Sequence, residues 1–157
     1  MTSHSNLAAV AALVLGTSLA APVLAQPTAV TLEGDVKVVH EVVENGKTRE
    51  TLDEPNQVLP GDRLVFTTHY RNAGDKPVTD FVVTNPLPAP VKLSQTGAFE
   101  VSVDGGKSYG PLAALKATGA DGKPRAAELG DVTHVRWRLA SIAPGASGDI
   151  TYFAEVR

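Results

Sequence analysis

The sequence predicts an all-β protein built as an antiparallel β-sandwich. Its 157 residues give room for one ordinary domain, and 14 Gly with 11 Pro provide many turns. Between these turns, short segments alternate apolar and polar residues, which is typical of strands that bury one face. After residue 25 no segment has the period of a helix. Eight to ten short strands are therefore expected.

The N-terminal 25 residues are expected to be a cleavable signal peptide. They contain no Lys, Arg, Asp or Glu, and residues 7–21 form an apolar run of 15 residues. A membrane-spanning helix needs about 20 residues, whereas this length suits the central region of a secretory signal. Small residues precede Gln26, which predicts cleavage after Ala25. The amino-terminal end lacks Lys and Arg, so an uncleaved membrane anchor is the alternative.

Residues 26–56 are expected to form N-terminal strands and a hairpin that pack on the domain. Residues 35–44 alternate strongly, with Val36, Val38 and Val42 on one side. Asn45-Gly46 then supplies the left-handed backbone conformations of a tight turn, and residues 47–52 form the return strand.

Residues 57–157 are expected to form the sandwich, with strands 63–71 and 78–85 as its central pair. The first of these strands places Leu64, Phe66, Thr68 and Tyr70 on one side. The turn between the strands contains Asn72 and Gly74, two residue types that tolerate left-handed geometry.

The rest of the chain predicts further short strands. They lie at 91–94, 99–103, 132–140 and 148–157, with a ribbon formed by 112–118 and 123–127. Strand 132–140 places Val135, Trp137 and Leu139 on one side, so the single Trp is expected to be buried. The expected core consists of Leu64, Phe66, Tyr70, Phe81 or Val82, Val135, Trp137, Leu139, Ile150 and Tyr152.

The order of these motifs resembles the bacterial conserved-repeat domain, the domain of unknown function numbered eleven. The resemblance covers residues 57–157 and rests on Pro60-Gly61-Asp62, on 70–74, on 82–88, on 135–137 and on 142–145. Asn85-Pro86 stands where the family more often has Asp followed by Thr or Ser, and only one copy is present. The resemblance implies an immunoglobulin-like module of exported and surface proteins that acts as a non-catalytic scaffold.

Composition excludes several classes of function. A net charge of -3 does not provide the basic surface that nucleic-acid binding needs. Zero Cys excludes disulfides, thiol chemistry and a lipid-anchor cysteine.

We expect no metal, cofactor or catalytic site. His40, His69 and His134 have no short ligand spacing, and the acidic residues near turns do not form a calcium loop. Gly145-Ala146-Ser147-Gly148 lacks the spacing of a nucleophile elbow. Residues 102–109 resemble an Asp-box, which predicts a structural turn. An isopeptide between Lys37 and Asp149 would need a buried acid beside it.

The sequence therefore predicts an exported, non-enzymatic structural or protein-binding module of the bacterial envelope. It would be periplasmic, secreted or on the cell surface, without stable membrane insertion, and its partner would be an unknown envelope or surface protein. One alternative is a periplasmic metal or small-ligand carrier that uses His69 and His134. Another is a subunit of a surface assembly joined by strand addition through residues 26–43. Lys37, Glu41 and Glu44 favour folding of this segment onto its own domain, because charge discourages edge pairing.

Overall fold

A computed structural model describes residues 29–157, so the predicted signal peptide and its cleavage site lie outside the described residues. The described chain is all-β, and every strand pair is antiparallel. Within residues 29–157 the helical segments are two single 3₁₀ turns, η1 (Leu112–Ala114) and η2 (Leu129–Asp131). In the same residues no helix has the length and apolar character needed to cross a membrane.

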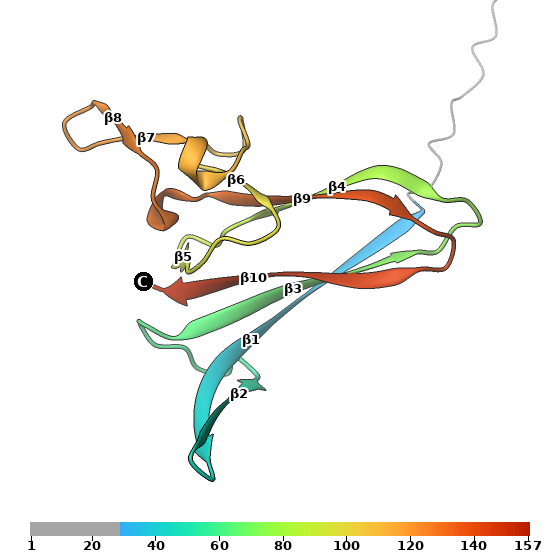
Figure 1. The fold of residues 1–157 in the computed structure, drawn as a ribbon, viewed down its shortest axis with the longest axis horizontal. Helices are drawn as coiled ribbons and strands as arrows, with labels where there is room; N and C mark the ends of the chain where they lie inside the picture. The colour runs from blue at the N-terminus through green and yellow to red at the C-terminus, as the bar shows by residue number, and fades with distance from the viewer. Residues whose placement is uncertain (1–28) are drawn as a thin grey trace, which may run out of the picture.

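A five-stranded sheet forms one layer. Its order is β2 (Lys47–Asp53), β1 (Val30–Glu44), β3 (Arg63–Asn72), β10 (Ser147–Val156) and β5 (Val91–Leu93). The predicted hairpin between β1 and β2 is confirmed, with Asn45 at φ 52° and Gly46 at φ 75°. Its outer part projects away from the two layers (Figure 1).

A three-stranded sheet forms the second layer. Its order is β4 (Val78–Pro86), β9 (His134–Ile142) and β6 (Glu100–Ser102), and it lies face to face with the first sheet (Figure 1). The predicted ribbon is also present. Its strands, β7 (Lys116–Thr118) and β8 (Pro124–Ala126), protrude beside the sandwich (Figure 1).

The core lies between the two sheets. Leu64, Val135, Trp137, Ile150 and Tyr152 are buried as predicted. The half-buried Phe66, Tyr70, Phe81 and Leu139 pack against them. Of the two alternatives offered for β4, Phe81 is the inward one, whereas Val82 is 42% exposed.

Aromatic rings fill the middle of this core. Phe66 stacks on Tyr152 with ring centroids 4.8 Å apart. The ring centroid of Trp137, on the opposite sheet, lies 6.2 Å from that of Tyr152. Because Tyr152 is desolvated by burial, the pKa of its hydroxyl is raised to about 12.

The expected central pair is wrong. β3 pairs with β1 and β10, whereas β4 pairs with β9, so the two strands belong to opposite sheets. Each strand alternates apolar and polar residues because its apolar side chains point into the core from its own layer. Periodicity shows which face of a strand is apolar, but it does not identify the strand's neighbour.

Asn72 has a different role from the expected left-handed turn residue. Its side chain is fully buried, and its Nδ2 donates to the carbonyls of Lys76 at 2.8 Å and Ile142 at 2.9 Å. Its Oδ1 accepts from the Gly74 N–H at 3.0 Å. Asn72 therefore joins the ends of β3 and β9 through its side chain.

A glycine is required at position 74 because the chain passes close to Ala29 there. It has no left-handed conformation, but a Cβ atom there would lie 2.9 Å from the Cβ of Ala29. The neighbouring Ala73 N–H donates to the Ala29 carbonyl at 2.8 Å, which brings the beginning of β1 against this turn.

Candidate functional site

One long side of the sandwich is open. The order of the sheets and the inter-sheet contacts place β4 opposite β3, where Asn85 contacts Thr68, and β9 opposite β10. Within the described residues, no strand of the second layer lies opposite β1. The second layer therefore ends at β4 and leaves part of the inward face of β1 uncovered.

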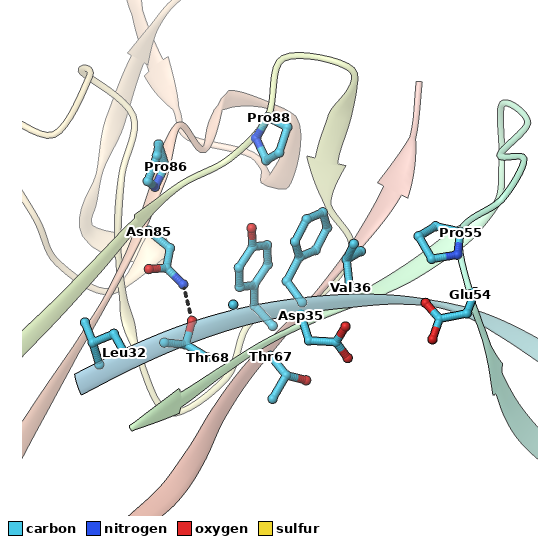
Figure 2. A pocket seen from close by; sticks show the side chains of 13 residues that line it. Leu32, Asp35, Val36, Glu54, Pro55, Thr67, Thr68, Asn85, Pro86 and Pro88 are labelled. Carbon is cyan, nitrogen blue, oxygen red and sulfur yellow. Dashed lines mark hydrogen bonds between the residues drawn. The ribbon is translucent and has the colours of Figure 1, made fainter. Parts of the chain in front are cut away.

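A groove of about 550 Å³ follows this open side (Figure 2). β1 and β3 form its floor, and prolines from two loops and from the end of β4 stand beside it. The lining is mostly apolar and includes Leu32, Val36, Phe66, Tyr152, Pro55, Pro86 and Pro88.

The floor follows the alternation of β1. Leu32, Gly34 and Val36 share its inward face and lie opposite Tyr70, Thr68 and Phe66 of β3. Leu32 is nevertheless 48% exposed, because none of the described strands covers it. A Cβ atom built on Gly34 would have no neighbour within 4 Å, so the middle of the floor borders open space.

The polar groups of the groove are few. Asn85 Nδ2 donates to Thr68 Oγ1 at 2.7 Å and joins β4 to β3 (Figure 2). Asp35 and Glu54 are the charged residues of the lining, but Asp35 directs its carboxylate to the other face of β1, whereas Glu54 lies beside Pro55 (Figure 2).

Lys37 contacts both of these carboxylates. Its ammonium donates to Glu54 and lies 3.7 Å from Asp35. The hydrogen bond to Glu54 raises the pKa of Lys37 above its usual range. Two carboxylates thus share one ammonium.

The edge of β4 beside the groove has regular strand geometry only between Asp80 and Pro86. Asp80 has φ 52°, and Pro86 has no N–H to donate. Between them, residues 81–85 pair continuously with residues 135–139 of β9. In an antiparallel strand, alternate residues direct N–H and C=O away from the paired neighbour. Among the strands of residues 29–157, none pairs with this edge of β4, so the short stretch has a free edge there.

The histidines do not converge. His69 Nδ1 lies 2.7 Å from Asp149 Oδ1, on the face of β3 opposite the core residues. His134 belongs to the other sheet and its Nδ1 lies 3.0 Å from Thr133 Oγ1, while His40 faces Asp53 at 3.7 Å. Among residues 29–157 no group of three or more His, Cys, Asp or Glu is arranged to hold a metal ion.

The Asp-box residues form a hydrogen-bonded turn. Asp104 Oδ1 accepts from the N–H groups of Lys107 and Ser108, both at 3.0 Å, and its Oδ2 accepts from Ser108 Oγ at 2.6 Å. These bonds hold the pKa of Asp104 well below its usual range. The bond from the Ser108 hydroxyl has the largest effect on this pKa. Gly105 and Gly106 have φ of 75° and 85°. The predicted turn role is confirmed by this geometry.

The remaining candidates also lie in local contacts. Asp62 accepts from the Leu59 N–H at 2.7 Å, and Asp121 accepts from the Lys123 N–H at 3.1 Å. Lys37 pairs with carboxylates near β1, whereas Asp149 pairs with His69, so the structure does not bring Lys37 and Asp149 together.

Sequence reasoning missed the groove. Its residues come from β1, β3, β4, β10 and two loops, and the segment 82–88 that carries part of the resemblance gave no sign of a groove. The one available signal was Gly34, because a glycine inside a strand often marks a place that another backbone approaches closely.

No family model matches this chain, and no curated protein and no solved structure matches it either. The resemblance to the conserved-repeat domain therefore stays a prediction from the motifs quoted above.

Proposed function

We propose that this chain is an exported immunoglobulin-like module of the bacterial envelope that binds an extended segment of another protein without catalysing a reaction. One observation carries the proposal, namely the apolar groove between the inward face of β1 and the free edge of β4. Such a groove supplies the two parts that recognition of extended peptides uses, a row of side-chain positions and an unpaired strand edge.

The energetic argument is the uncovered apolar surface. Leu32 is 48% exposed, and Gly34 leaves open space beside it. Removing apolar surface from water contributes about 25 cal/mol per Å², so a ligand that covers this floor gains free energy. The resemblance to envelope scaffold modules and the apolar N-terminal run favour the same kind of role.

The binding test uses a random-peptide library panned against the protein purified from cells that express the full chain. We expect enrichment of peptides on the wild-type protein and its loss on Gly34→Tyr, because the tyrosine ring would fill the groove. Thr31→Tyr is the matched control, since residue 31 lies on the same strand but on its other face. No enrichment, or equal enrichment on all three proteins, would contradict the proposal.

Export is tested separately. We expect the protein in the exported fraction, with Gln26 as its first residue when the N-terminus is sequenced. An intact N-terminus in the membrane fraction would instead identify the uncleaved anchor.

A further inference from the structure

The two layers differ in width on the open side. β4 lies opposite β3, and β1 continues the first layer by one more strand. Neighbouring strands lie about 4.8 Å apart in a sheet. A strand added to the free edge of β4 would therefore lie above the inward face of β1, where Leu32, Gly34 and Val36 form the groove floor.

The free edge of β4 limits the length of such a pairing. Asp80 interrupts the regular strand at φ 52°, and Pro86 removes a donor at the other end. Residues 81–85 remain available for backbone hydrogen bonds. Every strand pair in the described residues is antiparallel, and that geometry also gives the more stable pairing.

The charge of the groove gives the strand a direction. Asn85, near the C-terminal end of β4, contacts Thr68, which lies opposite Gly34. Glu54 lies farther along the same direction, past the end of β4, where it contacts Lys37. An antiparallel strand begins where β4 ends, so its N-terminal residue would meet the Glu54 carboxylate.

We propose that the groove accepts a β-strand from another polypeptide, antiparallel to residues 81–85 of β4. The strand alternates apolar and polar residues, and it carries Lys or Arg at its N-terminal end. Its apolar side chains cover Leu32, Gly34 and Val36, and its basic residue pairs with Glu54. This inference rests on the proposed function and specifies the partner's conformation and polarity.

A second free edge borders the same side. β2 pairs with β1 only from Val38 onward, so no strand of the described chain pairs with this edge of residues 30–37. A strand added there would extend the five-stranded sheet sideways and leave the groove floor uncovered. Covering the apolar floor is the larger gain, and it selects the edge of β4.

The test uses a synthetic peptide of one lysine followed by alternating valine and threonine, titrated into the isotope-labelled protein. We expect amide resonance shifts and slowed amide exchange at residues 81–85, together with shifts at residues 32–36. Shifts concentrated on the amides of residues 30–37 without protection of β4 would overturn the proposal.

Two N-methylated peptides test the backbone pairing. Methyl groups on one alternating set of amides would face β4, and those on the other set would face away. We expect one set to weaken binding about tenfold or more and the other to leave it nearly unchanged. Equal binding of the two peptides would exclude strand addition.

Two further comparisons test the site and its polarity. Gly34→Tyr should abolish binding, whereas the control Thr31→Tyr should not. The variant Glu54→Gln should weaken binding of the lysine peptide about two- to fivefold and leave an alanine-first peptide unchanged. An equal effect on both peptides would contradict the proposed direction.

The outcomes separate this inference from the function on which it rests. If library peptides depend on Gly34 but bind as helices, the groove binds proteins and strand addition is wrong. If no peptide of any kind binds, both proposals fail. If light scattering finds a dimer that Gly34→Tyr dissociates, the occupant is a second copy of this chain, and the proposal of a different partner is overturned.

Discussion

The two long sides of the sandwich differ although both belong to the same pair of sheets. On the closed side, residues 94–99 connect the edge strands β5 and β6, and Phe99 packs on Trp137 with ring centroids 5.3 Å apart. Leu93 on that side is 1% exposed. On the open side no connection crosses within residues 29–157, and Leu32 is 48% exposed.

The difference shows that burial of an inward side chain depends on the opposite layer. Leu32 and Leu93 are the same residue type in the same sheet. One is covered because the chain passes over that side, and the other faces a groove because the second layer stops at β4. A side chain that points inward is therefore buried only where the opposite layer covers it.

The largest effect is expected where the closed side meets the core. Trp137→Ala should lower the free energy of unfolding by about 3 to 5 kcal/mol, because it removes a buried ring that contacts Phe99 and Tyr152. Denaturant unfolding measures the change. Val82→Ala is the control and should cost less than about 1 kcal/mol, since Val82 faces outward. A loss below about 1 kcal/mol for Trp137→Ala would contradict its central position.

The matched leucines test the comparison directly. Leu93→Ala should cost about 2 to 5 kcal/mol, because it leaves a cavity among buried neighbours. Leu32→Ala should cost less than about 1 kcal/mol, because half of that side chain is already in water. Equal losses in denaturant unfolding would mean that the two sides are covered to the same extent.

Tyr152, which lines the groove and contacts Trp137, provides a pH test. Its pKa is about 12 in the folded protein against 10.0 ordinarily, so the unfolded chain loses this proton first. Stability should therefore fall as pH rises above 10 and level off above 12. Between pH 9.5 and 11 wild type should lose about 1 kcal/mol more than Tyr152→Phe. Parallel curves from denaturant unfolding at each pH would show that this hydroxyl is solvated in the folded state.

The smallest expected effect concerns two glycines on the inward face of the five-stranded sheet, Gly34 of β1 and Gly148 of β10. Gly34→Val should raise the free energy of unfolding by up to about 1 kcal/mol, because it meets open space and a β-branched residue suits a strand. Gly148→Ala should lower it, because a Cβ atom there would lie 2.6 Å from Tyr70 Cζ. Thermal melts compare the two variants. If Gly34→Val lowers the stability as Gly148→Ala does, the groove floor is not open.

Much of the fold was predictable because its causes are local. Side chains alternate along a strand, so the apolar positions of β3, β9 and β10 identify their inward faces. Asn45-Gly46 and residues 102–109 specify their turns through backbone conformation and nearby hydrogen bonds. The groove was not predictable, since its lining comes from segments that are distant along the chain.

The sequence by itself determined that this chain forms strands, where most of them turn and which face of each is apolar. Only the tertiary structure decided that β3 and β4 belong to opposite sheets, that Asn72 joins two strand ends, and that the second layer stops before covering β1. The physical reason is the distance along the chain between the residues that interact. Alternation and turn geometry depend on neighbouring residues, whereas strand partners and uncovered surface depend on contacts between segments far apart in the chain.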